Sequence, residues 1–276
     1  SSWIDLNENY SNSLPNNYSF TLENLIESGF YRLKYTNDCG SVYSNIMSVS
    51  VLPELVPPVI GNDQTIDFNA VPDPLVTLNP SSGGSGNHTI QWQVYSNSNS
   101  IWFDILNANN VSYSPGNLTD NTLYRVKVTD QQCDTVFSNI VTISVNPDLD
   151  PGSIGFDQFI CFNSIPDTLH NITNPTGGNG TYLYTWQISS DAIYWIDIPN
   201  SNFPYFIPYA LTDDSYFRRK VTSGSITKYS NIVEINVYDQ LLGGSILEEQ
   251  TVCFGSDITL FYLDTPCLLY TSDAAD

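Results

Sequence analysis

The stretch YRVKVTDQQCDTVFSNIVTISV, which runs from Tyr124 to Val145, decides the fold of this chain. Its first part alternates apolar and polar residues: Tyr124, Val126 and Val128 against Arg125 and Lys127. The same alternation returns after a polar turn, from Val141 onward. A period of two is typical of strands that bury one face and expose the other. The stretch therefore predicts two half-buried strands joined by a turn.

This stretch is one of three copies, which start at Tyr31, Tyr124 and Phe217 and are spaced by 93 residues. Three other blocks recur with them. One starts at Gly61, Gly155 and Glu248, a second starts at Gly83 and Gly177, and a third surrounds Trp3, Trp102 and Trp195. Self-similarity at a fixed period is the signature of a repeat architecture. It predicts the back half of one repeat at 1–52, complete repeats at 57–147 and 151–238, and the start of another at 241–266.

Each complete repeat contains roughly seven short alternating runs, separated by turn signals and without a helical period between them. This pattern predicts an all-β chain of antiparallel β-sandwich domains. The joins between repeats are short, and the first two contain proline, which stiffens a linker. We therefore expect an extended array and not a compact globule.

Four aromatic residues are the expected structural core of the two complete repeats. Trp92 and Trp186 lie on the third expected strand, where immunoglobulin-like sandwiches carry a buried tryptophan. Tyr124 and Phe217 open the sixth strand, and Asp120 before Tyr124 suggests a tyrosine corner. Phe217 has no hydroxyl, so that hydrogen bond cannot form in the third repeat. These positions predict immunoglobulin-like domains.

Charge and hydropathy narrow the classes of partner. The formal net charge is −21, a surface that repels phosphate backbones and anionic membranes. We therefore expect an acidic extracellular protein with no nucleic-acid partner. The sequence contains no apolar run of about 18 residues, so no membrane insertion is expected in this fragment.

The last ten residues, CLLYTSDAAD at 267–276, resemble a translated sequencing adapter. The remainder of the chain begins without an initiator methionine or a signal peptide. We therefore interpret the chain as an internal, metagenomic fragment with a non-native tail, and we exclude the tail from fold reasoning.

Several motifs resemble the immunoglobulin-like repeats of large cell-surface adhesins of gliding bacteria. The matching segments are Gln158 to Phe162, Gly177 to Gln187, Trp195 to Ile198, Tyr113 to Thr119, and Phe217 to Val237. Each motif is weak alone, but the set is specific and covers residues 1–266. The resemblance implies export by the type IX secretion route and a role in spacing and adhesion, not catalysis.

The cysteines depart from the pattern of that family, whose members usually carry one Cys in the opening strand and one near the last turn. The second repeat has Cys133 but Asp67 at the opening position, and the third has Cys161 but Ile226 at the turn. We expect Cys133 and Cys161 to lie at the same end of consecutive domains, roughly 30–40 Å apart. Both should therefore be unpaired. Cys39 and Cys253 belong to the truncated repeats, so their candidate partners lie outside the fragment.

The sequence offers little for catalysis or for a cofactor. His88 and His170 occupy non-equivalent repeat positions, so a shared catalytic or metal site is not expected. Asp148 and Asp150 raise the idea of calcium at a linker, but the other linkers lack matching pairs. We expect no enzyme activity, no cofactor and no metal.

Two surface features leave alternatives open. Trp3, Trp102 and Trp195 either pack at the edge of the sandwich or stack on sugars. Seven of the eight basic residues lie in or beside the sixth strand, either as a ligand-binding stripe or as cross-strand partners for acidic residues. Arg219 breaks the alternation, and we expect it near the rim of its sandwich.

Two functional hypotheses follow. In the first, the chain is a non-catalytic structural and adhesive segment of a bacterial cell-surface or secreted protein. In the second, it is a carbohydrate-binding module attached to a secreted polysaccharide-active protein. Exposed Trp102 and Trp195 in a groove would favour the second. The expected partners are neighbouring repeats of the same chain and an extracellular or cell-surface ligand, with a glycan among the candidates.

Overall fold

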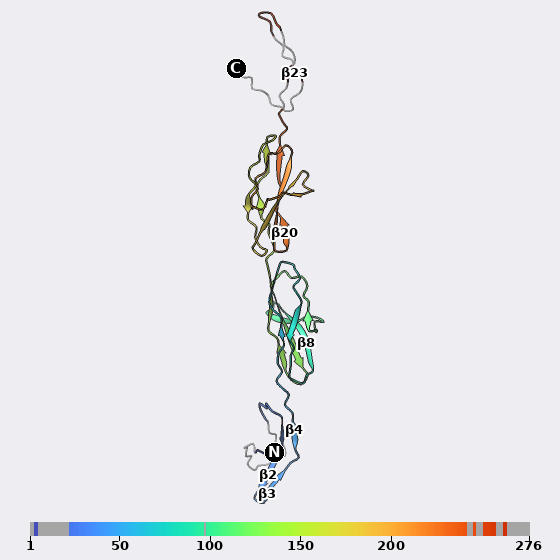
Figure 1. The fold of residues 1–276 in the computed structure, drawn as a ribbon. Coiled ribbons are helices and arrows are strands. Elements are labelled where there is room, and N and C mark those ends of the chain that lie inside the picture. The colour runs from blue at the N-terminus through green and yellow to red at the C-terminus, as the bar shows by residue number, and fades with distance from the viewer. Residues whose placement is uncertain are drawn as a thin grey trace.

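The computed structural model describes residues 3–4, 22–96, 98–241, 245–246, 251–257 and 262–263. Every regular element in these ranges is a β-strand, and Figure 1 shows strands gathered into bodies that follow one another along one line. The chain is an all-β array of immunoglobulin-like β-sandwiches, which confirms the predicted fold class. The expected tail at 267–276 and much of 1–52 and 241–266 lie outside the described residues.

The N-terminal part contributes two antiparallel pairs. Its strands are β1 (Gly29–Tyr31), β2 (Lys34–Asn37), β3 (Gly40–Tyr43) and β4 (Met47–Val49). β1 pairs with β4, and β2 forms a hairpin with β3. Near the C-terminus, β22 (Ser245–Ile246) pairs with β23 (Tyr262–Leu263). These pairs flank two sandwiches that are described in full except for residue 97.

The second repeat has two sheets. Its strands are β5 (Val59–Ile60), β6 (Gln64–Ile66), β7 (Leu75–Asn79), β8 (His88–Ser96), β9 (Ile101–Asp104), β10 (Ser112–Tyr113), β11 (Thr122–Asp130), β12 (Thr135–Phe137) and β13 (Val141–Val145). The smaller sheet has the order β10-β7-β5. The larger has the order β6-β13-β11-β8-β9, with β12 also on β11. β6 runs parallel to β13, and every other pairing is antiparallel.

The third repeat has the same plan with a reduced small sheet. Its strands are β14 (Ser153–Ile154), β15 (Gln158–Ile160), β16 (Asn171–Thr173), β17 (Leu183–Ser189), β18 (Ile196–Asp197), β19 (Ser215–Ser223), β20 (Ile226–Tyr229) and β21 (Val233–Val237). The larger sheet has the order β15-β21-β19-β17-β18, with β20 on β19. The smaller sheet keeps only β14 and β16, and an isolated bridge joins Leu169 to Phe206.

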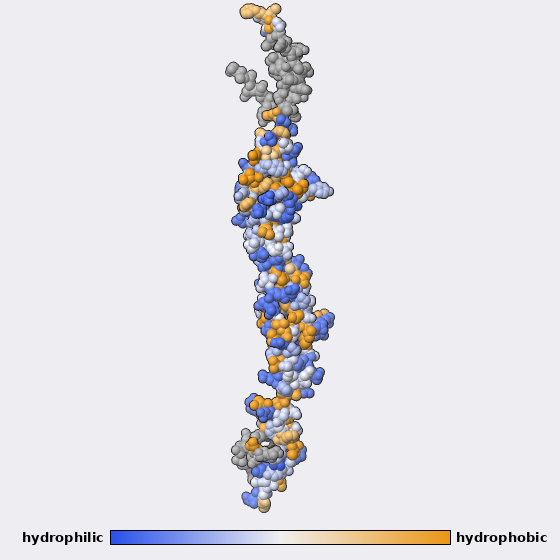
Figure 2. All heavy atoms as spheres, viewed as in Figure 1, coloured by the Kyte–Doolittle hydropathy of each residue, from blue (hydrophilic) through white to orange (hydrophobic). Residues whose placement is uncertain are grey.

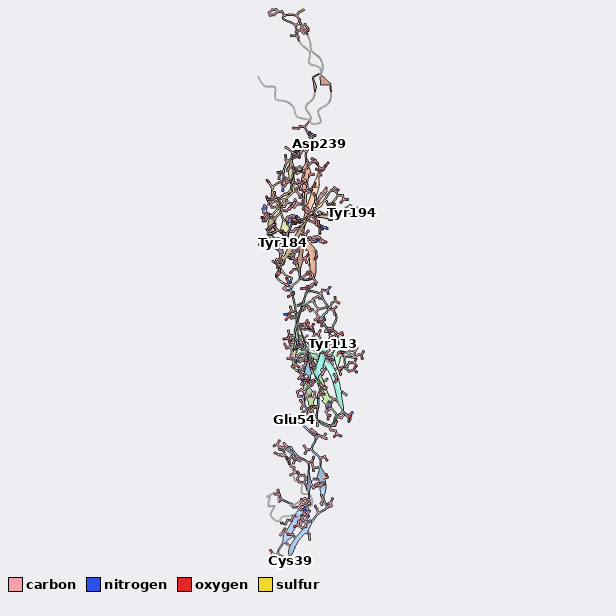
Figure 3. The ribbon with its side chains drawn as sticks, viewed as in Figure 1. Cys39, Glu54, Tyr113, Tyr184, Tyr194 and Asp239 are labelled. Atoms are coloured by element: carbon pink, nitrogen blue, oxygen red, sulfur yellow. The ribbon has the colours of Figure 1, made fainter. Side chains whose placement is uncertain are left out.

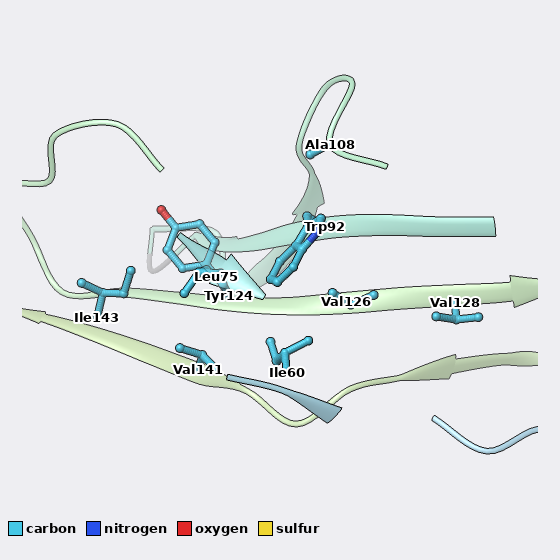
Figure 4. Packing of buried hydrophobic residues seen from close by; sticks show 9 residues of the cluster. All are labelled: Ile60, Leu75, Trp92, Ala108, Tyr124, Val126, Val128, Val141 and Ile143. Atoms are coloured by element: carbon cyan, nitrogen blue, oxygen red, sulfur yellow. The ribbon is translucent and has the colours of Figure 1, made fainter. Parts of the chain in front are cut away.

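A tryptophan fills the space between the two sheets of each sandwich. Trp92 on β8 and Trp186 on β17 are both fully buried. Figure 4 shows Trp92 close to Val126 of β11, above Ile60 of the smaller sheet. Each indole N–H donates to a carbonyl of the following loop, Asn110 at 2.9 Å and Phe203 at 3.1 Å. Such a side chain is worth about 3–5 kcal/mol against truncation to alanine.

The aromatic residues that open the sixth strand also face this core. Tyr124 is buried and lies 5.8 Å from the ring of Tyr113, while Phe217 is fully buried. Burial, with a smaller contribution from Tyr113, raises the pKa of Tyr124 to about 12. The carboxylate of Asp120 accepts a hydrogen bond from Thr119 and none from Tyr124 among the described residues. The hydrogen bond of a tyrosine corner with Asp120 is therefore not formed.

Arg219 contradicts the expectation that it lies near the rim. It is fully buried and takes the inward place that Val126 has in the second repeat. Its Nη1 donates to Pro204 O at 2.9 Å and also to Asn171 Oδ1, and its Nη2 donates to Pro151 O at 2.9 Å. Burial lowers the pKa of the Arg219 guanidinium because its charged form loses water.

The reason for this placement is the period of the strand, which overrides the polarity of one side chain. Turning Arg219 outward would also turn Phe217 and Val221 out of the core, since alternate residues share a face. The reduced small sheet of this repeat leaves three oxygen acceptors facing β19, and the guanidinium satisfies them. Its Nε remains without a partner.

We predict that Arg219→Ala destabilises the third repeat by at least about 2 kcal/mol, because it leaves a cavity and three part-buried acceptors without this donor. Hydrogen exchange of β19 and β21 against denaturant measures the loss within that repeat. Lys220→Ala is the matched control, since its half-exposed ion pair with Asp197 contributes at most about 1 kcal/mol. Equal losses in the two variants would contradict the structural role of Arg219.

Candidate functional site

The outward face of the larger sheet carries the same stack of side chains in both complete repeats, and the N-terminal part has an equivalent stack. The guanidinium of Arg125 lies between Trp102 at 4.3 Å and Phe137 at 4.0 Å from the ring centroids. Arg218 lies between Trp195 at 4.2 Å and Tyr229 at 4.1 Å. Arg32 lies between Trp3 at 4.0 Å and Tyr43 at 3.9 Å. We call each of these an outer-face stack.

Strand register brings the members of each outer-face stack together. Arg125 is opposite Gln93 of β8, and Trp102 of β9 is opposite Tyr95 on the far side of β8. Phe137 of β12 is opposite Lys127, the next outward residue of β11. An arginine side chain is long enough to reach Phe137 on the neighbouring strand β12 and Trp102 on β9, which lies beyond β8. The stack of the second repeat therefore spans four adjacent strands, β12, β11, β8 and β9, on the face that the alternation of the sequence turns outward.

A polar chain continues each stack along the sheet in the two complete repeats. Arg125 Nε donates to Gln93 Oε1 at 2.7 Å, and Gln93 Nε2 donates to Asp104 Oδ1 at 2.6 Å. Lys127 Nζ then donates to Asp104 Oδ2 at 2.8 Å. The hydrogen bonds from Lys127 and Gln93 lower the pKa of Asp104. Basic side chains on this face are thus paired with acidic and amide groups of the same sheet.

The third repeat reproduces this polar chain with equivalent residues. Arg218 Nε donates to Gln187 at 2.6 Å, and Gln187 Nε2 donates to Asp197 at 2.5 Å. Lys220 Nζ donates to the second oxygen of Asp197 at 2.6 Å. Two repeats that differ in most loop residues therefore preserve the same network, which supports a scaffold role for it.

The three tryptophans that could stack on sugars differ in exposure. Trp102 and Trp195 are half-buried, whereas Trp3 is 44% exposed. In each case one face of the indole is already covered by a guanidinium. The ring of Tyr95 also lies 5.2 Å from that of Trp102, tilted by 58°. These contacts therefore do not form the flat, open aromatic platform that binds sugar rings.

The linkers are bound to the repeat that follows them. Gly178 N donates to Pro147 O at 2.8 Å, and Gly84 N donates to Pro53 O at 2.9 Å. Gly177 has φ of +75°, and a Cβ there would lie only 1.9 Å from Asp148 O. Bridges between Asp150 and Thr176 and between Val56 and Ser82 extend each contact. Each linker therefore packs against the Gly-Gly turn of the repeat that follows it.

Two side-chain contacts cross the junction between the second and third repeats. Asp67 follows β6 of the second repeat, and its Oδ2 accepts from Ser225 N at 2.7 Å and Ser225 Oγ at 2.6 Å. Ser225 is at the tip of the β19–β20 hairpin of the third repeat. Lys228 of the same hairpin donates to Asp148 of the linker at 2.7 Å. The two repeats are therefore in direct contact.

Asp67 also ties this contact to its own repeat. Its Oδ1 accepts from Asn146 Nδ2 at 3.0 Å, and Asn146 is the first residue after β13. The hydrogen bonds from the Ser225 hydroxyl and amide, followed by that from Asn146, lower the pKa of Asp67. One carboxylate thus joins the trailing end of one sandwich to the hairpin tip of the next.

Among the described residues, none of the four cysteines is paired with another cysteine of this chain. Cys133 is half-buried, and Cys39, Cys161 and Cys253 are exposed. We call the end at which the chain enters a repeat its leading end, and the opposite end its trailing end. Cys133 lies at the leading end, because its N–H donates to Asp130, and Asp130 also accepts from Ser85 N in the Gly-Gly turn. Cys161 follows β15, and β15 pairs with the last residues of β21. It therefore lies at the opposite, trailing end, not at the leading end as the sequence analysis assumed.

The remaining candidates have structural partners. His88 Nδ1 bonds with Ser81 at 2.8 Å and its Nε2 with Gly83 O at 3.1 Å, whereas His170 is exposed. Asp148 is paired with Lys228, and Asp150 accepts from Gly152 N. The described residues contain no group of three or more His, Cys, Asp or Glu arranged to hold a metal ion. They also contain no helix that is long and apolar enough to span a membrane.

Two sets of residues were missed by sequence reasoning. The Gln-Asp pairs, Gln93 with Asp104 and Gln187 with Asp197, recur with the repeats, and that recurrence was the available signal. The contact between Asp67 and Ser225 left no such signal. Asp67 and Ser225 each stand where other repeats have a cysteine. The two residues lie 158 positions apart in the sequence. Only the stacking of one repeat on the next brings them together.

The family described as "Domain of unknown function (DUF8696)" matches residues 56–147 and 150–239. The search of curated proteins gives no match. Among solved structures, the chain is similar to Drosophila OTK extracellular domains 3–5, with 14% identity over 76% of this chain and 71% of that chain and a TM-score of 0.36. The A168–A170 domains of titin give 17% identity, 76% and 75% coverage and a TM-score of 0.38.

We predict that acid loosens the junction between the second and third repeats. Because the folded pKa of Asp67 lies below its ordinary value of 3.8, the contact is complete above that value and is lost as the pH falls through the lowered pKa. Exchange of the Ser225 amide, measured between pH 6 and pH 2.5 and corrected for intrinsic rates, should lose protection at the acid end. Asp67→Asn should remove this pH dependence, and its persistence in that variant would assign the change to another group.

Proposed function

We propose that this chain, which belongs to the family described as Domain of unknown function (DUF8696) over both complete repeats, is a non-catalytic spacer and adhesive segment. The segment would belong to an extracellular or cell-surface protein whose repeats present a binding region at a distance from the cell. Its domain boundaries would be those of the 93-residue sequence period. The neighbouring repeats of the same chain are then its first partners.

The observation that supports this proposal is the direct contact between the second repeat, the linker and the third repeat. The linker carbonyl of Asp148 lies against Gly177, and Asp67 reaches across to Ser225. A linker that is hydrogen-bonded to the following domain has little freedom to bend. Figure 1 shows the resulting linear succession of sandwiches, which suits a spacer.

The surface also fits a spacer better than a carbohydrate-binding module. The indoles of Trp102 and Trp195 are stacked on arginines, and the acidic and basic groups beside them are paired. On the coloured part of the face shown in Figure 2, hydrophobic and hydrophilic groups are interspersed. Adhesion would then depend on surface outside these paired side chains, with an extracellular ligand or a glycan as the partner.

We also propose, from the sequence motifs alone, that the chain comes from a gliding bacterium. The opening QFICF at Gln158 to Phe162 and the WIDI segment at Trp195 to Ile198 resemble adhesin repeats of gliding bacteria. In that setting the repeats would be exported by the type IX route and displayed on the cell surface. The adapter-like residues 267–276 would be foreign to that protein.

We predict that Gly177→Ala makes the array more flexible, because the new Cβ would overlap Asp148 O and displace the linker. Small-angle scattering of the chain should then show a broader distribution of maximum dimensions than the parent. Gly180→Ala is the matched control: its φ of +81° imposes the same backbone strain, but its Cβ would meet nothing within 4 Å. An unchanged scattering curve for Gly177→Ala would contradict a spacer built on seated linkers.

We also expect no sugar recognition through the outer-face stacks. A glycan array probed with the chain and with a Trp102→Ala/Trp195→Ala variant should give the same pattern for both, since an arginine covers one face of each indole and the rings are half-buried. Glycan signals that vanish in the variant would instead support the carbohydrate-binding alternative. Thermal unfolding of the variant shows whether a loss of signal reflects misfolding.

A further inference from the structure

We propose that successive repeats are cross-linked by a disulfide at each junction whose two facing positions are cysteines. One position is the residue that follows the first strand of the larger sheet, at the trailing end of a repeat. The other is in the tip of the hairpin between the last two strands, at the leading end of the next repeat. We call these the trailing position and the tip position. The inference is independent of what the array binds.

The complete junction in this chain shows that these two positions face each other. Asp67 occupies the trailing position of the second repeat, and Ser225 occupies the tip position of the third. The side chain of Asp67 touches both the hydroxyl and the amide of Ser225, at 2.6 Å and 2.7 Å. Standard bond lengths therefore keep the two Cα atoms within roughly 8 Å. A disulfide joins Cα atoms about 4.4–6.8 Å apart, which a small movement of the exposed hairpin tip supplies.

Cys161 and Cys253 occupy the trailing position of their own repeats. In all three cases the residue begins the same turn: Ala70 N, Ser164 N and Ser256 N each donate at 3.1 Å to the carbonyl of Asp67, Cys161 and Cys253. A residue with positive φ precedes each donor, namely Asn69, Asn163 and Gly255. Ile160 O accepts from Tyr238 N, as Ile66 O accepts from Asn146 N. Cys161 thus faces the repeat that follows.

Cys39 and Cys133 occupy the tip position. The β2–β3 hairpin pairs Asn37 with Gly40, and the β19–β20 hairpin pairs Ser223 with Ile226, so each tip has two residues. Cys39 is the second of these, as Ser225 is. Figure 3 shows Cys39 at the extreme tip of its hairpin, away from the second repeat. Cys133 lies in a longer tip that joins β11 to β12.

The distribution of cysteines follows from this geometry. The described residues contain six such positions, and four of them are Cys39, Cys133, Cys161 and Cys253. The other two, Asp67 and Ser225, are each other's partner across the only junction for which both positions are described. Pairing within one repeat would require its two ends to meet, as Cys161 at the trailing end and the β19–β20 tip at the leading end illustrate. Pairing between neighbours requires only the contact that the structure already shows.

The chemistry is ordinary thiol–disulfide exchange. As the S–S bond forms, the two cysteine thiols give up two protons and two electrons. A disulfide oxidant, either a small-molecule disulfide or a thiol–disulfide oxidoreductase, accepts them and is released as two thiols. Such oxidants prevail outside the cytosol, where cell-surface proteins are located. In the junction without cysteines, the hydrogen bonds of Asp67 take the place of the covalent link.

The test places cysteines at the junction of this chain. Asp67→Cys/Ser225→Cys is made in a background in which Cys39, Cys161, Cys253 and Cys267 are replaced by serine and Cys133 is kept as an internal competitor. After oxidation with glutathione disulfide, non-reducing peptide mapping should recover residues 67 and 225 linked, with two fewer thiols than in the reduced chain. Linkage of 67 to Cys133, or no linkage in a chain with parental circular dichroism, overturns the proposal.

A second measurement addresses the natural cysteines in the full-length protein. Non-reducing peptide mapping of the protein as it is displayed outside the cell should recover Cys39, Cys133 and Cys161 each linked to a peptide of an adjacent repeat. The single variants Asp67→Cys and Ser225→Cys serve as controls for the first experiment, since each should keep its new thiol free. Recovery of the natural cysteines as free thiols, or linked within one repeat, contradicts the inference.

Discussion

The antiparallel register between β8 and β11, repeated by β17 and β19, is the constraint on which the rest of the structure depends. It buries Trp92 opposite Val126 and places Gln93 opposite Arg125 on the other face. A shift of one residue would exchange the two faces, exposing the indole and burying the guanidinium. The core and the outer-face stacks are therefore two results of one pairing. Neither could be changed without the other.

Much of this could be predicted from the sequence, because period-two alternation and a fixed repeat length are local signals. Trp92, Trp186, Tyr124 and Phe217 lie in the sandwich interiors for that reason. Arg219 was misplaced because polarity was weighed above the period of its strand. The missing signal was the loss of small-sheet pairing in the third repeat, which leaves carbonyls that a guanidinium can satisfy. Hydrophobicity alone does not reveal such acceptors.

The candidate site was less accessible to sequence reasoning. The outer-face stacks could be anticipated in part, since the basic residues and the tryptophans recur together. Their mutual contacts could not, because these depend on which strands are neighbours. The junction could be predicted least of all. Asp67 and Ser225 have no local pattern in common, and assigning Cys161 to the wrong end of its repeat concealed that trailing and tip positions meet. Contacts between domains follow from assembly and not from periodicity.

The Gly-Gly turns have a consequence for how anything outside the chain can approach it. In a free-standing immunoglobulin-like domain, the loops at the two ends of the sandwich are open to ligands. Here the leading end of the third repeat is covered by the linker carbonyl above Gly177 and by Asp67 of the preceding repeat. What stays available is the long flank of each sandwich. A ligand would therefore contact a series of similar sheet faces. Its affinity would increase with the number of sandwiches that it contacts, and not with the fit of a single pocket.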